Sequence, residues 1–522
     1  MNPNFSRLFN RHAWSDDPAF DDLVEAVFVS LSIDSKEKLI VKSNNKGKVS
    51  PQTILKVVLV DQYLSYKQNP KLCTAFSRKT NSWIVSSQYN GLDIPRKIID
   101  VVDALIEAEY LSNEDGKFYK KSDPSNKTSR IQHTEKLRRL FDAIDVSLSS
   151  IDPHHKEETI ILRDKDYPED EKAKDVEYKK LGLETPQVIQ MRKEVDAYNT
   201  MMQPHYVDVV SLAEPILERE TTNKKTGEVE TQIIHIHPSN LFIRRIFSRG
   251  QFNKHGRWYG GFWQQLPKKG QDFRKDIYID DEPTDEIDFS GLHPTLLALK
   301  KGHTIDGDRY DLGYKVCSTI PLSKQRDIVK RLVLIAINAK SRQKAFGAYN
   351  SNNEPVKARD LAKLLDAFID KHPYLEDDMC TDKGIDLMYT DSQITAAVIR
   401  RFVELDKPIL PVHDSYIVKV SDSNLLKQIM REACEEEVEQ TLQFESEHSK
   451  RQSHISHATH YRLTDYEYYE TVRNSHISKV TTEYRERYRK WVETQQQHSP
   501  LRTTGTSREA CRNNASLQHF YI

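Results

Sequence analysis

The chain has 522 residues, which at about 150 residues per domain suggests about three domains. Its 77 Lys and Arg residues balance its 78 Asp and Glu residues, so a globally basic nucleic-acid-binding protein is excluded and any basic surface must be local. The five cysteines form no C-x2-C pair, which argues against a zinc module or a disulfide framework. The longest apolar run, residues 332–337, is far shorter than the ~20 residues of a membrane helix, so we expect a cytoplasmic protein with no membrane partner.

Residues 1–142 have the pattern of a winged-helix-like domain. Ser50 and Pro51 are typical of a helix start, and apolar residues at helical spacing predict a second helix over residues 95–110. A turn signal at residues 113–116 then leads into a lysine-rich hairpin. This order of helix, helix and basic hairpin predicts site-specific DNA binding. The alternative is a small helical domain with a solvated basic loop.

Differences in composition divide the rest of the chain into four segments. Residues 143–184 are charged and irregular, which is typical of a linker. Residues 185–249 predict a long helix from Thr185 to about residue 202 and then two short strands. Residues 250–436 alternate strand-like and helix-like runs and hold every chemical motif. Residues 437–522 form a polar extension with no sustained apolar face outside residues 461–472, and we expect its end to be disordered.

Two aspartates each follow a strand-like run. Asp288 follows residues 277–287, and Asp414 lies between two apolar runs, at the tip of a predicted hairpin. Two carboxylates at neighbouring strand ends can hold two divalent cations about 3.5–4 Å apart, a geometry that suits phosphoryl transfer. Either aspartate alone is more often a turn or helix-cap residue.

A basic helix is predicted between the two aspartates. Arg326 and Lys330 are four residues apart and share one face of it, and Asn338 lies eight residues further along the same face. Guanidinium and ammonium groups on one face can clamp a triphosphate, because they neutralise charge on phosphate oxygens. The alternative is a solvated basic face on an amphipathic helix.

Together these motifs resemble the family A DNA polymerases and, more distantly, the phage-type single-subunit RNA polymerases. The stretch from Asp288 is similar to motif A, Arg326-x3-Lys330-x7-Asn338 to motif B, and Val412-His413-Asp414-Ser415 to motif C. Two further stretches are similar to conserved segments that precede motifs A and C; they contain Arg257 and Gln264 in the first and Gln393 in the second. The resemblance covers about residues 250–425.

The resemblance implies an α+β fold, a right-hand polymerase with palm, fingers and a thumb-like element, in which residues 185–249 would be the thumb. It also implies that Asp288 and Asp414, with the carbonyl of Phe289, bind two Mg²⁺ ions, for which Mn²⁺ is a substitute. Arg326 and Lys330 would hold the phosphates of the incoming nucleoside triphosphate.

The same resemblance implies four contacts with a DNA primer-template, from Arg257, Gln264, Gln393 and His413. Two positions depart from the family pattern: His293 aligns with the motif A glutamate, and Asn338 aligns with the motif B tyrosine. Both positions govern the choice of nucleotide sugar in the family, so we assign both to nucleotide binding and leave the sugar preference open. His293 can occlude the 2′-position by its bulk, or it can be a buried, hydrogen-bonded histidine.

We therefore expect a nucleotidyltransferase, with a DNA-directed DNA polymerase favoured. Residues 1–235 lack the paired D-x-E and Y-x3-D arrangement of a proofreading exonuclease, so we expect no proofreading. An alternative is an RNA-synthesising or primase-like polymerase. An alternative of another class is a DNA-binding replication or regulatory factor with an inactive palm. A winged helix ahead of a palm suggests recruitment to one DNA site, such as an origin on a mobile element.

Overall fold

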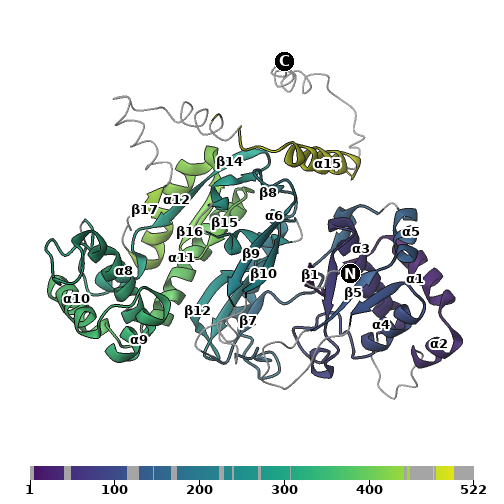
Figure 1. The fold of residues 1–522 in the computed structure, drawn as a ribbon, viewed down its shortest axis with the longest axis horizontal. Coiled ribbons are helices and arrows are strands. Elements are labelled where there is room, and N and C mark those ends of the chain that lie inside the picture. The colour runs from purple at the N-terminus through teal and green to yellow at the C-terminus, as the bar shows by residue number, and fades with distance from the viewer. Residues whose placement is uncertain are drawn as a thin grey trace.

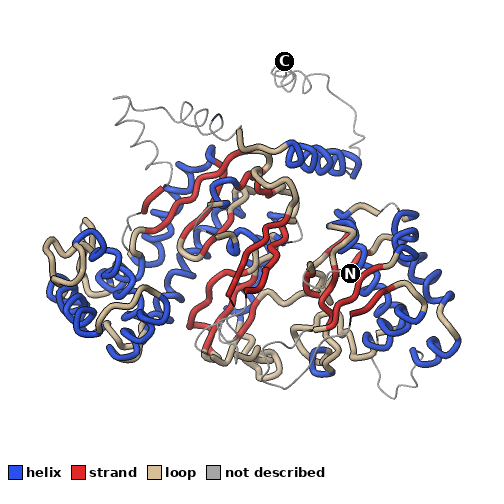
Figure 2. The backbone as a smooth tube through the Cα atoms, viewed as in Figure 1, coloured by secondary structure: helices blue, strands red, loops and turns tan. Residues whose placement is uncertain are grey.

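The computed structural model is a mixed α/β fold (Figure 1). It describes residues 5–39, 49–114, 128–144, 146–165, 173–222, 229–237, 240–267, 272–305, 307–439, 444–446, 474 and 478–498. Figure 2 shows a group of helices at one end, strands in the middle and the N-terminal helices at the other end. No helix in these ranges is long and apolar enough to span a membrane.

The N-terminal region packs helices against a four-stranded sheet. The helices are α1 (Pro18–Ser30), α2 (Ile33–Leu39), α3 (Pro51–Gln68), α4 (Ile98–Glu107) and α5 (Glu135–Ala143). The strands, in spatial order, are β1 (Ser6–Leu8), β3 (Cys73–Phe76), β5 (Ser129–His133) and β4 (Leu111–Glu114). The predicted helix start is confirmed, because the Ser50 hydroxyl accepts a hydrogen bond from Thr53 N at 3.1 Å.

A hairpin is present as the antiparallel pair β4 and β5, but Asn113 and Glu114, which are part of the predicted turn, belong to β4. Its predicted lysine-rich tip falls within residues 115–127, which lie outside the described residues. The winged-helix assignment therefore stays a prediction.

The charged segment 143–184 is not irregular throughout. Strand β6 (Ile151–Asp152) pairs with β2 (Trp14–Ser15), and β7 (Ile160–Leu162) pairs in parallel with β11 (Arg244–Ser248). The Glu177 carboxylate accepts hydrogen bonds from the Ser87 hydroxyl and from Gln88 N. This segment joins the N-terminal region to the rest of the chain, and its short apolar strands are hard to recognise among so many charges.

An antiparallel sheet forms the centre of the larger body. Its strands, in spatial order, are β15 (Leu410–Val412), β16 (Ser415–Lys419), β14 (Glu282–Phe289), β13 (Ile277–Ile279) and β8 (Val207–Val209). Strand β17 (Phe444–Ser446) pairs with the end of β14. Helices α6 (Pro186–Met202), α11 (Gly384–Glu404) and α12 (Ser423–Val438) pack with this body.

Residues 185–249 do not form a separate unit. Their strand β8 is the edge of the central sheet, and β11 pairs with β12 (Gln251–Tyr259), which packs on α11. The two short strands predicted after the long helix are confirmed as the antiparallel pair β9 (Ile216–Thr222) and β10 (Val229–His235). A thumb-like role for this segment stays a prediction.

A block of helices lies between β14 and α11 in the sequence and beside the central sheet in space (Figure 1). It consists of α7 (Leu292–Leu299), α8 (Leu322–Asn338), α9 (Arg342–Asn352) and α10 (Ala358–Lys371). These helices share one continuous apolar core with the sheet, because buried residues of both belong to the same cluster. Helix α8 carries the predicted basic face.

The polar C-terminal extension contains a helix that its composition does not predict. Helix α15 (Thr482–His498) packs on the central sheet, where Tyr484 is fully buried against Tyr206 and Tyr278. Its apolar face is short, since only Tyr484, Tyr488 and Trp491 line it in a polar sequence. The predicted apolar stretch at residues 461–472 lies outside the described residues.

Candidate active site

The two aspartates lie at neighbouring strand ends, Asp288 near the end of β14 and Asp414 in the turn directly before β16. Asp288 pairs in register with Ser415 across β14 and β16, and Phe289 N donates to the carbonyl of Asp414 at 3.2 Å. The predicted placement of both carboxylates at neighbouring strand ends is therefore confirmed. Their binding of a metal stays a prediction.

A two-residue turn presents Asp414. His413 and Asp414 connect β15 to β16, and His413 adopts a left-handed conformation with φ +58°. The Ser415 hydroxyl donates to Glu286 Oε1 at 2.8 Å, which braces the turn against β14. Burial, assisted by the positive charge of Arg257, lowers the pKa of His413 to about 4, so this imidazole is neutral at pH 7.

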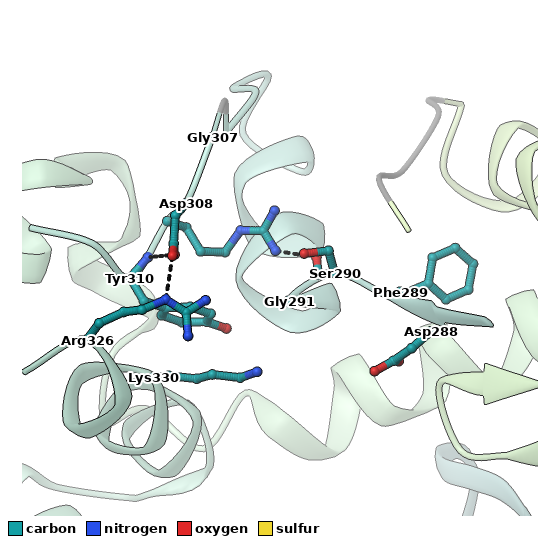
Figure 3. A pocket seen from close by; sticks show the side chains of 10 residues that line it. Asp288, Phe289, Ser290, Gly291, Gly307, Asp308, Tyr310, Arg326 and Lys330 are labelled. Atoms are coloured by element: carbon teal, nitrogen blue, oxygen red, sulfur yellow. Dashed lines mark hydrogen bonds and ion pairs between the residues drawn. The ribbon is translucent and has the colours of Figure 1, made fainter. Parts of the chain in front are cut away.

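A polar cavity of about 270 Å³ opens at this end of the sheet (Figure 3). Its wall consists of residues 288–291, residues 307–310, Arg326 and Lys330. Figure 3 shows Arg326 and Lys330 extending from α8 on one side and Asp288 on the other. The structure therefore brings the predicted carboxylate and the two predicted cations to one cavity.

Arg326 forms an ion pair inside this cavity with Asp308. Burial would raise the pKa of Asp308, but the contact with Arg326 lowers it below its ordinary value. The same contact raises the pKa of Arg326. Both side chains keep more than a third of their surface exposed. An exposed ion pair of this kind contributes little to the stability of the fold, so its members readily exchange one another for other partners.

Two residues assigned to nucleotide binding lie elsewhere. Neither Asn338 nor His293 belongs to the cavity wall that the described residues form. Asn338 ends α8, and its Nδ2 donates to the carbonyl of Leu334 at 2.7 Å. His293 is buried, and its Nε2 lies 2.9 Å from Asp391 Oδ2. Of the two alternatives for His293, the structure has the buried, hydrogen-bonded histidine.

Three residues assigned to primer-template binding are engaged with the protein. Arg257 binds the carboxylate of Asp391 through Nε, at 3.2 Å to each oxygen. Gln264 Nε2 donates to the carbonyls of Trp258 and Pro411. Gln393 Oε1 accepts from Arg245 Nη2 at 2.8 Å.

Arg257 and its carboxylate partner form a buried charge pair near the turn. Burial would lower the pKa of Arg257, but Asp391 raises it above its ordinary value, with a further contribution from Asp414. Arg257 thus lies close enough to Asp414 and to His413 to interact with both electrostatically. Contact of these residues with a nucleic acid stays a prediction.

The sequence motifs do not indicate the segment 308–310 or Asp391 as parts of the site. The three residues of the segment lie in a loop without periodicity, where only their alternating charge and the preceding Gly307 distinguish them. Asp391 could have been found, because it occupies the buried face of α11 with Leu387, Ile394 and Val398. A carboxylate on an apolar helix face needs a partner.

No protein-family model matches the chain, and no curated protein matches it. Among solved structures, the chain is similar to the polymerase domain of Pol1 from M. smegmatis, in a complex with DNA primer-template and dNTP. The TM-score is 0.26 and the identity 12%, over 39% of this chain and 47% of that chain. The chain thus matches about half of the length of that domain. A likeness this weak carries no argument about function, which has to come from the geometry of the site.

Proposed function

We propose that this protein is a nucleotidyltransferase, a template-directed polymerase that adds nucleotides to a primer 3′-hydroxyl. The observation that carries the proposal is the cavity that joins Asp288 to Arg326 and Lys330, with Asp414 on the adjacent strand end. Carboxylates at one side and cations at the other are what a metal-bound triphosphate requires. DNA-directed DNA synthesis is the form that we favour, because of the resemblance of motif A. We propose that it proceeds without proofreading, because residues 1–235 lack the paired D-x-E and Y-x3-D arrangement of an exonuclease.

The donor groups at the sheet end fit magnesium. Within the described ranges, no cluster of three or more Asp, Glu, His or Cys side chains could hold a metal alone. Magnesium is commonly bound by one or two carboxylates together with substrate phosphates, and Asp288, Asp414 and the Phe289 carbonyl supply such a set. Bound Mg²⁺ would activate the attacking hydroxyl and neutralise charge on the phosphate.

In the proposed reaction the primer 3′-hydroxyl gives up its proton to water and its oxygen bonds to the α-phosphorus. The bond from that phosphorus to the β-bridging oxygen breaks, and pyrophosphate leaves. The protein positions the reacting groups and neutralises the negative charge of the phosphates. Arg326 and Lys330 hold the β- and γ-phosphates, and the ammonium and guanidinium groups stabilise the negative charge of the leaving pyrophosphate. The exchangeable pair of Arg326 with Asp308 leaves the guanidinium available to the substrate.

A second candidate within the same class is a polymerase that uses ribonucleotides. One observation favours it: the two positions that correspond to the sugar-selecting residues of the family, His293 and Asn338, are occupied with protein partners away from the cavity wall. The N-terminal region, in either case, would bind duplex DNA at a specific site.

The test is primer extension on a defined DNA template with Mg²⁺, comparing dNTPs with NTPs. The Asp414→Asn variant should lose extension by at least about a thousandfold. Asp406→Asn is the matched control, because Asp406 is exposed, lies before β15 and has a φ of +52° that asparagine tolerates. Extension by the wild type and by Asp406→Asn, but not by Asp414→Asn, supports the proposal.

Two other results of primer extension would change the proposed function. Extension with NTPs alone would move the protein to the RNA-synthesising branch. A wild type that incorporates neither nucleotide but still shifts duplex DNA would be a DNA-binding factor, and the polymerase proposal would then be wrong.

A further inference from the structure

We propose that the hydroxyl of Tyr310 donates a hydrogen bond to a non-bridging phosphate oxygen of the bound nucleoside triphosphate, as a third contact beside Arg326 and Lys330. The inference rests on the proposed function, because it names one more residue that holds the substrate of that reaction. It starts from a buried hydroxyl, on a residue of the cavity wall, for which the described residues offer no hydrogen-bond partner.

Tyr310 is 3% exposed, and it forms part of the cavity wall. Within the part of the chain that the structure describes, no group is in position to hydrogen-bond to its buried Oη. Native proteins leave few buried hydroxyls unsatisfied, because the desolvated group costs free energy unless it finds an acceptor. A ligand in the cavity would supply that acceptor.

The hydroxyl faces the space between the two charged sides of the cavity. Figure 3 shows the Tyr310 ring behind Arg326, with its hydroxyl pointing toward the side where Asp288 lies. The charges of Arg309, Asp308, Arg326 and Asp414 all act on its ionisation, so both cations and carboxylates lie near this hydroxyl. A chain of phosphates that joins these two sides would pass this hydroxyl.

Burial raises the pKa of Tyr310 to about 12, so at neutral pH the phenol keeps its proton. It is therefore a neutral donor. The oxygens of a triphosphate are ionised acceptors, and hydrogen bonds to charged acceptors are the stronger kind. The protonated Tyr310 hydroxyl and an ionised triphosphate oxygen are therefore a complementary donor and acceptor.

The tyrosine is held in place before any ligand binds. Asp308 Oδ1 accepts a hydrogen bond from Tyr310 N at 2.9 Å, and the guanidinium of Arg309 donates to the carbonyl of Ser290. The Tyr310 ring lies nearly parallel to that of Phe368, at a centroid distance of 6.5 Å. A donor fixed in this way loses little freedom when the ligand arrives, so its hydrogen bond contributes fully to affinity.

A phosphate is a better partner for this hydroxyl than a sugar. Arg326 and Lys330 of α8, which line the same cavity, are cations and attract the charged part of a nucleotide. Arg309, which also lines the cavity, adds a third positive charge to the wall. The nucleotide sugar has no charge that would place it among these groups.

The test is the Tyr310→Phe variant, which removes the hydroxyl and keeps the ring packing. Two quantities are measured: the KM for the nucleotide in primer extension, and the inhibition constant of inorganic tripolyphosphate in the same assay. We expect both to rise about tenfold. Tyr314→Phe is the matched control, because Tyr314 is 57% exposed and does not belong to the cavity wall, and it should leave both constants unchanged.

Unchanged constants in Tyr310→Phe would overturn the proposal. A rise in the KM alone, with tripolyphosphate inhibition unaffected, would also overturn it, since the hydroxyl would then contact the sugar. Binding of tripolyphosphate to the Asp414→Asn protein, with and without Tyr310→Phe, is measured by calorimetry and needs no catalysis. If the wild type extends no primer but this binding depends on Tyr310, the polymerase proposal fails and the phosphate contact stands.

Discussion

Arg257 donates its Nε to both carboxylate oxygens of Asp391, a residue 134 positions later in the chain. The pair joins β12 to α11, and His293 also binds the same carboxylate. Asp391 is 1% exposed, so its charge depends on these partners rather than on water. Removing one member of such a pair leaves the other buried without compensation.

We therefore expect Asp391→Leu to destabilise the protein by about 3–5 kcal/mol, measured from its urea unfolding. The double variant Arg257→Met with Asp391→Leu should lose less unfolding free energy than the sum of the losses of the two single variants. In the double variant neither member of the pair is left as a buried charge without its partner. Glu436→Gln, at an exposed pair with Arg400, is the control and should change stability by less than about 1 kcal/mol. Strictly additive losses would show that the pair is not coupled.

Local signals in the sequence predicted much of the fold. Ser50 and Thr185 each precede a proline, and each caps the helix that follows, because both signals act within one helical turn. The placement of Asp288 and Asp414 was also predictable. Each ends a strand, and hairpin connections bring such ends together.

What the sequence did not predict depends on partners far away in the chain. Arg257 was assigned to the primer-template by its motif, but its orientation depends on Asp391 in a different element. Tyr310 lies in a loop whose contacts to Ser290 and Phe368 leave no periodic pattern. Helix α15 was missed because its stability comes from packing on Tyr206 and Tyr278 rather than from its polar composition.

Asn338 and Gly384 provide a test of one such long-range contact. A Cβ added to Gly384, the first residue of α11, would overlap Asn338 Oδ1 at the end of α8. Gly384→Ala should therefore cost about 1–3 kcal/mol in unfolding free energy, measured in urea. Asn338→Ala in the same protein should recover most of that loss. If the double variant is as unstable as Gly384→Ala alone, a different clash is responsible.

Asp308 competes with the proposed substrate for Arg326. Asp308→Asn keeps the Oδ1 that accepts from Tyr310 N but removes the charge that pairs with Arg326. We expect the KM for nucleotides in primer extension to fall by up to about fivefold, with a smaller effect at high salt. Asp311→Asn is the matched control, because Asp311 caps Gly313 N in the same way and lies outside the cavity wall. A higher KM in Asp308→Asn would mean that the carboxylate assists binding.

Helix α15 should contribute to the stability of the central sheet. Tyr484 is fully buried, and its hydroxyl donates to Asp281 Oδ1 at 3.0 Å. Tyr484→Ala removes both the buried ring and this bond, and we expect a loss of about 3 kcal/mol in urea unfolding. Lys490→Ala, at an exposed position of the same helix, should have little effect. Equal stability of the two variants would show that the helix does not hold the sheet.

His133 makes the stability of the N-terminal region depend on pH. Burial, with the nearby charge of Arg138, lowers its pKa from 6.5 to about 4. As the pH falls below 6.5 the unfolded chain binds a proton that the folded chain takes up only near pH 4, so the free energy of unfolding decreases across this window. At pH 5 this single group should cost about 2 kcal/mol relative to pH 7.5. His133→Gln keeps a donor for the carbonyl of Pro70 and cannot titrate.

The measurement is urea unfolding of both proteins at pH 7.5 and pH 5, followed by a probe in the N-terminal region. The difference between the proteins at pH 7.5 reports every effect of the substitution other than titration. The wild type should lose more stability on acidification than His133→Gln does, because it alone has a group at position 133 that must be protonated on unfolding. Parallel losses in the two proteins would mean that His133 has the same pKa folded and unfolded, and the acid sensitivity would then come from other groups.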